Sequence, residues 1–311
     1  MALGNDVIQV NLHEIVGSGR QGVVCRATRM DTNEIVAVKL VNLSNIQPEA
    51  RLLECQELTV RLDGFLSISH RHLLSHIKHQ TILTDSPTLN PIEYQILMEY
   101  CSGGALNNYV RFNVLPYSLL PKWTKQILSG LVYLHEQNWA HRDIKGGNIF
   151  LSSPNIDSCD LKIGDLQDMK RMVERTTHIA GAASGQGTCA FMSPEIAHPD
   201  GMRIGRRTDI WSLGCVVIQM VTGEAPRLYR GTTLLNTAQS MMYFLGTGGM
   251  PALPAGLPPL LRQFIERCLQ RDVADRPHAT DLENDAFLAD YNNANLPNRA
   301  TFYQAYEPIQ P

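Results

Sequence analysis

The chain has 311 residues, of which 44% are hydrophobic, and a formal net charge of −3. This length suits two domains or one large one, and the slightly negative charge excludes the basic field that holds nucleic acid. The first residues lack the pattern of a secretory signal and no apolar run could cross a bilayer, so we expect a cytoplasmic protein with no membrane insertion. The seven scattered cysteines form no CxxC pair and are expected to be reduced thiols.

The first hundred residues alternate β-rich segments with turns. β-branched and aromatic runs predict strands at 23–30, 34–41 and 94–100, and "DTNE" predicts a hairpin turn between the first two. One helix is predicted at about 48–66, with an inward face that consists of Leu58, Leu62, Phe65 and Leu66.

After residue 103 the pattern changes to helices, predicted at 119–137, 210–223 and 257–270. We therefore predict an α+β, bilobal fold: a small β-rich lobe (about 10–101) with one main helix, a hinge near 102–104, and a larger, mainly α-helical lobe (about 105–290). The segment 291–311 is rich in Asn and Pro and is predicted to be a loose extension.

A glycine-rich stretch, "VGSGRQGVV" (16–24), carries Gly17, Gly19 and Gly22 at GxGxxG spacing. Glycines leave backbone N–H groups open to phosphate oxygens. A dinucleotide-binding loop would need a helix after it, whereas strands are predicted on both sides here. The pattern favours a flap over the phosphates of ATP, to which Val16, Ser18 and Val24 also belong.

Lys39 ends the strand sequence "VAVK", where an inward lysine needs a charged partner. ATP phosphates and a helix glutamate would supply that charge. Glu54 lies one turn before Leu58 on the inward face, whereas Glu57 could pair with Arg61 on the solvent side. The spacing from the lysine favours Glu57, so both glutamates stay candidates.

The sequence "HRDIKGGN" (141–148) places three chemically useful side chains close together. Asp143 can orient a hydroxyl and take its proton, Lys145 can neutralise a phosphoryl group, and Asn148 can hold a metal. Asp165, in "KIGDLQ", follows a short apolar run and is a second candidate ligand for Mg2+.

These motifs occur together and in order, and from about residue 10 to 290 the chain resembles a eukaryotic serine/threonine protein kinase. "HRDIKGGNI", "FMSPE" and "DIWSLGCVVIQMVTGEAP" are most similar to the MAP kinase kinase kinases of the STE group. The resemblance implies ATP and Mg2+ as cofactors and a protein substrate, which in this subfamily is a MAP kinase kinase. It also implies further nucleotide-binding residues: Val24, Ala37 and Phe150 around adenine, the backbone of Glu99 and Cys101, and Met98 as gatekeeper.

The resemblance also gives roles to residues outside the nucleotide site. Glu195 in "SPE" is expected to pair with Arg276, and Asp209 to brace the catalytic loop. Phosphorylation at Thr176, Thr177 or Ser184, with the phosphate bound by Arg142, is expected to order the activation segment. By the same resemblance, Thr188 is expected to be a structural residue or to line the substrate groove.

Gln167 departs from the family, which has glycine at this place in the DFG motif. Asp165 keeps its carboxylate, so our hypothesis is that phosphotransfer is retained and that Gln167 restricts the flip between active and inactive forms. The alternatives are a pseudokinase or scaffold that binds nucleotide without efficient catalysis, and a small-molecule kinase. The sequence does not identify the upstream regulator, which must be a separate partner, a loop or a region outside this chain.

Overall fold

The computed structural model describes residues 7–19, 22–83, 92–166, 169–172, 189–198 and 205–290, and the backbone of 306–308. The chain divides into two compact units, Met1–Ser102 and Gly103–Pro311. In the described residues, every helix is too short or too polar to cross a membrane. The two units are described in turn.

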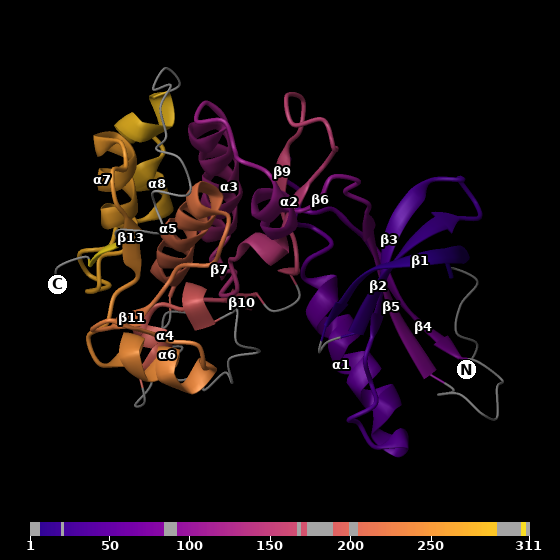
Figure 1. Ribbon diagram of the computed structural model, residues 1–311. Coiled ribbons are helices and arrows are strands. Elements are labelled where there is room, and N and C mark those ends of the chain that lie inside the picture. Colours follow the sequence, from indigo (N-terminus) through magenta and orange to yellow (C-terminus); the bar gives the residue numbers. More distant parts are fainter. Residues whose placement is uncertain are drawn as a thin grey trace. The chain divides into compact units, whose positions relative to one another are not determined.

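The first unit is an antiparallel sheet with one helix (Figure 1). Its five strands have the order β1-β2-β3-β5-β4. Their bounds are β1 Val10–Gly19, β2 Gly22–Arg29, β3 Ile35–Val41, β4 His76–Leu83 and β5 Ile92–Glu99. The apolar side chains of the central strands form a fully buried cluster of Ala27, Val36, Val38 and Leu97. Burial of this cluster fixes the strand register, because a one-residue slip would turn it to the other face.

The turn between β2 and β3 is the hairpin that "DTNE" indicated. Asn33 has a φ of 58°, a left-handed conformation that asparagine tolerates better than most residues. Its N–H donates to the Arg29 carbonyl (2.9 Å), and the Arg29 N–H donates to the Glu34 carbonyl (2.9 Å). The turn therefore sets the pairing of Thr28 with Ile35 and, further along, of Val24 with Lys39.

The helix of this unit is shorter than its apolar pattern indicated. A 3-10 turn, η1 (Pro48–Ala50), precedes α1 (Arg51–Asp63), and Gly64 follows it. Leu62 and Phe65 are buried, as expected, but Leu66 is 49% exposed. The inward assignment of Leu66 was wrong because the helix ends at Asp63, so the helical periodicity does not continue to it.

The second unit is mainly helical and contains several short strands (Figure 1). Its helices are α2 Leu106–Phe112, α3 Leu119–Glu136, η2 Gly146–Asn148, η4 Cys189–Phe191, α4 Pro194–Ala197, α5 Arg207–Thr222, α6 Ala238–Gly246, α7 Pro259–Cys268, α8 Ala279–Leu282 and η5 Ala286–Ala289. Its strands are β6 Gly104–Ala105, β7 Trp139–Ala140, β8 Ile149–Leu151, β9 Leu161–Ile163, β10 Lys170–Arg171, β11 Tyr229–Arg230, β12 Thr233–Leu234, β13 Ala252–Pro254 and β14 Tyr306–Pro308.

Helix α5 is the core of this unit. From Thr208 to Thr222 every side chain is buried, as the nearly all-round apolar sequence indicated. Gly223 ends the helix with a left-handed φ of 82°, and its N–H donates to the Gln219 carbonyl (2.8 Å). A fully buried helix gives fixed positions to the few polar side chains that it carries, and these include Asp209.

The segment 291–311, for which a loose extension was expected, is described only at Tyr306–Pro308. These residues form β14, which pairs antiparallel with β13, so this part of the segment is joined to the second unit by backbone pairing.

Candidate active site

Asp209 joins α5 to the loop 141–148. Its Oδ1 accepts from the Arg142 N–H (2.7 Å), and its Oδ2 accepts from the His141 N–H (2.9 Å) and contacts His135 Nε2 (2.8 Å). Burial alone would raise the pKa of Asp209, but the hydrogen bond with His135, together with His141 and the Arg142 N–H, outweighs it and lowers the pKa. An ionised carboxylate inside the fold therefore positions the loop, as the family resemblance implied.

The backbone at Arg142 needs this support. Its φ of 71° is in the left-handed region, which costs a non-glycine residue on the order of 1 kcal/mol. The hydrogen bond from its own N–H to Asp209, together with that from His141, holds this conformation. The strain lies directly before Asp143, where it sets the direction in which the loop continues.

Two side chains contact the same carboxylate oxygen of Asp143. Its Oδ2 lies 2.6 Å from Lys145 Nζ and accepts from Asn148 Nδ2 (2.9 Å). Asn148 Nδ2 also donates to the Asp143 carbonyl (2.9 Å). Both partners of this amide group are acceptors, so it must be the nitrogen that faces them, and Asn148 Oδ1 is directed elsewhere.

His141 is buried and links this loop to the segment before Asp165. Its Nδ1 accepts from the Asp143 N–H (3.3 Å), so in the neutral ring the proton is on Nε2, which donates to the Gly164 carbonyl (2.8 Å). The Gly164 N–H donates to the Asn148 carbonyl (2.8 Å). Gly164 is thus held on both sides by the loop that carries Asp143.

Asp165 follows Gly164 with a left-handed φ of 60°. Strain at a non-glycine residue persists where the surroundings hold it, and here the pairing of Ile149 with Ile163 and the two bonds of Gly164 do so. The second unit therefore brings Asp143, Lys145, Asn148 and the Asp165 backbone into one connected network. Gln167 lies outside the described residues.

The first unit carries the other predicted residues. Lys39 is 8% exposed and pairs with Val24 on β2 and Ile96 on β5. Ala37, also buried, pairs with Met98. Val24, Ala37, Lys39 and Met98 thus lie on three adjacent strands, β2, β3 and β5.

The glycine-rich stretch forms the hairpin between β1 and β2. Gly17 pairs with Val24, Ser18 with Val23 and Gly19 with Gly22. Gly22 has a φ of 139°, and a Cβ there would overlap the Leu40 carbonyl oxygen, so this position requires glycine. Val16 is 46% exposed. The strands on both sides distinguish this loop from a dinucleotide-binding one, as the sequence indicated.

The remaining predicted residues lie near residue 100 and on β8. Glu99 ends β5, where its N–H donates to the Ser75 carbonyl (3.0 Å) and its Oε1 accepts from the Ser75 N–H (2.6 Å). Cys101 is buried. Phe150, in the second unit, pairs with Lys162 and with Ala105.

The two candidate glutamates of α1 differ in exposure. Glu54 is partly buried and Glu57 is exposed, as is Arg61. Exposure therefore agrees with a solvent side for Glu57 and with the inward face for Glu54.

Glu195 pairs with Arg276, which confirms the expected link. Oε1 and Oε2 of the glutamate accept from Nη1 (2.7 Å) and Nη2 (3.0 Å) of the arginine. Thr208 Oγ1 also donates to Glu195 Oε1 (2.9 Å), and the Arg276 guanidinium lies 5.2 Å from the Trp211 ring centroid. The "SPE" segment is thereby fixed to α5.

The sequence analysis did not identify two groups that form hydrogen bonds in this network. His135, on α3, had no motif around it, and its role comes only from the approach of α3 to Asp209. The Gly164 carbonyl belongs to the backbone, so no side chain in the sequence indicates its role. His141 was part of the quoted motif, but its spacing to Gly164 is visible only in the fold.

The comparisons with known proteins agree with this arrangement. The family model "Protein kinase domain" matches residues 10–288. The chain is 33% identical over 282 residues to mitogen-activated protein kinase kinase kinase 19 of Mus musculus, covering 88% of this chain and 20% of that protein. It is 31% identical over 279 residues to mitogen-activated protein kinase kinase kinase 2 of Arabidopsis thaliana, covering 88% of this chain and 40% of that protein.

The chain thus spans less than half the length of these relatives. They confirm the resemblance to MAP kinase kinase kinases that the motifs indicated. With a family model that matches nearly all of it, the chain belongs to the protein kinase domain family.

Proposed function

We propose that the chain is a protein serine/threonine kinase that transfers the γ-phosphoryl group of Mg-ATP to Ser or Thr hydroxyls of protein substrates. The observation that carries the proposal is the Asp143 carboxylate, whose Oδ2 is held by Lys145 and Asn148 while Asp209 holds the loop. Phosphoryl transfer requires positioning and charge neutralisation more than covalent chemistry, and this network supplies both.

Asp143 is proposed to position the substrate hydroxyl and to accept its proton. Among the described residues, both side-chain contacts of the carboxylate engage Oδ2, which leaves Oδ1 for the hydroxyl. Its side chain is 19% exposed, so it is accessible to a substrate. Lys145, next to the same carboxylate, is proposed to neutralise charge on the transferred group.

Asn148 and Asp165 are proposed to hold Mg2+. The fit rests on donor chemistry: Mg2+ prefers oxygen ligands, and the bonds of Asn148 Nδ2 direct the amide oxygen away from Asp143. A bound Mg2+ would supply positive charge to the phosphate oxygens. The described part of the chain contains no group of three or more His, Cys, Asp or Glu residues placed to hold a metal ion, so phosphate oxygens and water would complete the shell.

The nucleotide-binding residues are proposed from the family resemblance. They are Lys39 and the 16–24 loop for the phosphates, Val24, Ala37 and Phe150 for adenine, Met98 as gatekeeper, and the backbone of Glu99 and Cys101. Glu54, which is partly buried, is proposed as the partner of Lys39 in preference to the exposed Glu57.

The kinase domain is proposed to extend over 10–290, and a MAP kinase kinase is proposed as the substrate by similarity to the relatives named above. A cytoplasmic location is part of the same proposal, supported by seven cysteines that are all buried thiols. Incubation with a panel of MAP kinase kinases tests the substrate, and cell fractionation tests the location.

Transfer of labelled phosphate from ATP to myelin basic protein tests the activity. We expect incorporation by the wild type and none by Asp143→Asn. Asn108→Ala, a change at an exposed residue of α2, is the control. Nucleotide binding without incorporation would overturn the proposal in favour of a pseudokinase, and transfer only to small molecules would favour a small-molecule kinase.

A further inference from the structure

β4 carries two histidines, His76 and His79, that a β-bulge turns to the same face of the sheet. On a regular strand, residues three positions apart lie on opposite faces. Here His76 pairs with Met98 and His79 with Ile96, so three steps along β4 match two steps along β5, and β4 contains one inserted residue. Met98 and Ile96 share a face of β5, and the two histidines that pair with them therefore share it as well.

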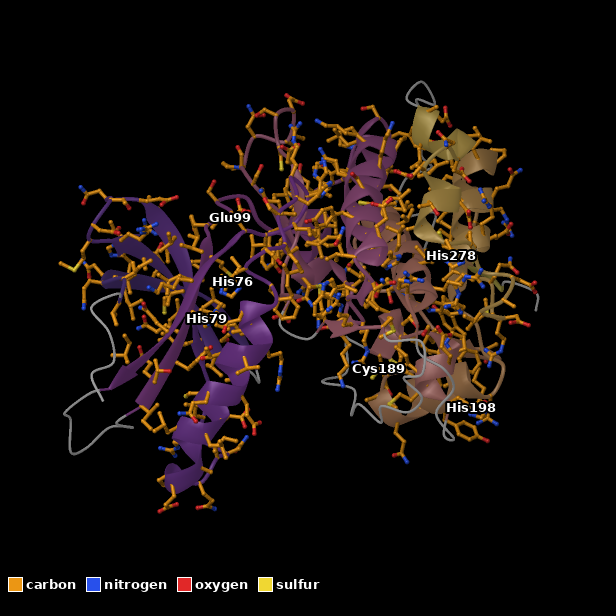
Figure 2. All side chains as sticks on the ribbon, turned by 180° about the vertical axis from the view of Figure 1, so that it is seen from behind. His76, His79, Glu99, Cys189, His198 and His278 are labelled. Carbon is orange, nitrogen blue, oxygen red and sulfur yellow. The ribbon has the colours of Figure 1, made fainter. Side chains whose placement is uncertain are left out.

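The bulge brings one nitrogen of each ring close to the other. His76 Nε2 lies 3.3 Å from His79 Nδ1, and the ring planes are inclined at 74° (Figure 2). This separation is long for a hydrogen bond, since N–H donors usually lie within about 3.2 Å of their acceptors. Two nitrogen ligands of one tetrahedral ion, each about 2.0–2.1 Å from it, are separated by about 3.3–3.4 Å. The two ring nitrogens are therefore spaced like two ligands of one metal ion.

The other nitrogen of His79 contacts a carboxylate. His79 Nε2 is 3.2 Å from Oδ1 of Asp63, the last residue of α1. A neutral ring carries its proton on the nitrogen that faces such an acceptor, so the lone pair is on Nδ1 and is directed at His76. Histidines that bind metals commonly donate their second N–H to a carboxylate in this way, which fixes the tautomer and makes the ligand more basic.

Tyr94 holds the His79 ring from another side. The two rings are stacked, with centroids 6.2 Å apart and planes 17° apart. Tyr94 is fully buried, and its hydroxyl lies 3.0 Å from Thr59 Oγ1 on α1. The side chain of His79 is itself 6% exposed. Packing and hydrogen bonds thus fix this ring before any ion arrives, which lowers the entropic cost of binding one.

We infer that His76 and His79 bind a transition metal ion of the Zn2+, Cu2+ or Ni2+ class, with Asp63 as the hydrogen-bond acceptor behind His79. Neutral imidazole suits these ions, whereas Mg2+ prefers oxygen, so the site differs in chemistry from the one proposed at Asn148 and Asp165. No third His, Cys, Asp or Glu of the described chain is placed to join the pair as a ligand, so water completes the shell and the ion is exchangeable.

The ion would act on the attachment of α1 to the sheet. Both ligands belong to β4, whereas Asp63 belongs to α1. A bound cation polarises the His79 ring and makes its N–H a stronger donor to the carboxylate. Metal binding should therefore stabilise the first unit where the end of its helix meets the edge strand, independently of phosphotransfer.

Isothermal titration of the full chain with Zn2+ at neutral pH, with Mg2+ in excess to fill oxygen sites, tests the inference. We expect saturable binding by the wild type and its loss in His76→Gln and in His79→Gln. Asp63→Asn should weaken binding by roughly 10-fold, the lower end of the effect of removing a carboxylate behind a metal-bound histidine. His13→Gln, at an exposed histidine of β1, is the control and should retain the wild-type affinity.

Electron paramagnetic resonance of the wild type with Cu2+ needs no variant to fold, and it should show hyperfine coupling to two imidazole nitrogens. Zn2+ should also raise the urea midpoint of the wild type and of His13→Gln, but not that of His76→Gln. No saturable binding by the wild type, coupling to fewer than two imidazoles, or equal affinity in the wild type and both ligand variants overturns the site. An unchanged affinity in Asp63→Asn contradicts the part assigned to Asp63.

Discussion

Glu195 and Arg276 form a two-point ion pair in which the glutamate is 1% exposed and the arginine fully buried. Burial alone raises the pKa of Glu195, but the hydrogen bond and charge of Arg276 outweigh it and lower the pKa. The pair is separated by 81 positions in the chain, so it joins α4 to the segment before α8.

Arg276→Ala should destabilise the protein strongly, because it leaves a carboxylate buried without its partner. We expect a loss of about 3–5 kcal/mol in the free energy of unfolding, measured by urea denaturation. The control is Arg262→Ala, which removes a partly exposed i,i+4 pair with Glu266 and should cost no more than about 0.5 kcal/mol. Similar losses for both variants would contradict the importance of burial here.

Asp209→Asn should weaken the support of the loop 141–148. The amide can no longer accept at both oxygens, so one of the bonds from His141 and Arg142 is lost. We expect a loss of about 1.5–3 kcal/mol in the free energy of unfolding, the range for hydrogen bonds to a charged group. We also expect a fall in kcat that exceeds any rise in KM for ATP. A variant with wild-type kcat would show that the strained Arg142 backbone does not need this carboxylate.

The stability of the first unit should fall on mild acidification because of a histidine pair. His76 and His79 lie together on β4, with His76 Nε2 3.3 Å from His79 Nδ1 and His79 Nε2 3.2 Å from Asp63 (Figure 2). Burial, and then the neighbouring His79, lower the pKa of His76 to about 4. Burial also lowers the pKa of His79 despite the opposing effect of Asp63.

Each folded pKa is below the ordinary histidine value of 6.5, so the neutral form is favoured by the fold. Their contribution is fully present above pH 6.5 and is lost as the pH falls towards about 4. We expect the urea midpoint to fall over this window and to fall less in His76→Gln. Burial also lowers the pKa of His278, which lies in the second unit. His278→Gln therefore measures how much of the pH dependence comes from that unit. An unchanged pH profile in His76→Gln would contradict this origin.

Gln167 remains the main departure from the family pattern. We expect the wild type to autophosphorylate, Asp165→Ala to lose incorporation, and Gln167→Gly to retain it, because Asp165 and not residue 167 supplies the carboxylate. An inactive wild type that Gln167→Gly rescues would contradict the hypothesis.

Activation-segment phosphorylation is a separate expectation, since Thr176, Thr177, Ser184 and Thr188 lie outside the described residues. Phosphatase treatment should lower activity, and the combined change of Thr176, Thr177 and Ser184 to Ala should remove that sensitivity. Activity that is unchanged by the phosphatase would count against regulation at these positions.

Much of this protein could be predicted from its sequence because the determining patterns are local. The apolar run of α5, the glycine at its end and the "DTNE" turn each set their own backbone, and "HRDIKGGN" brings Asp143, Lys145 and Asn148 together within eight positions. The tertiary structure alone decided the partners that are distant in the chain: His135 beside Asp209, Gly164 beside His141, and Asp63 beside His79. A side chain carries no local signal of what another helix will place against it, because that contact depends on how buried apolar faces pack. The same reason explains why sequence spacing favoured Glu57, whereas the partial burial of Glu54 favours the other glutamate.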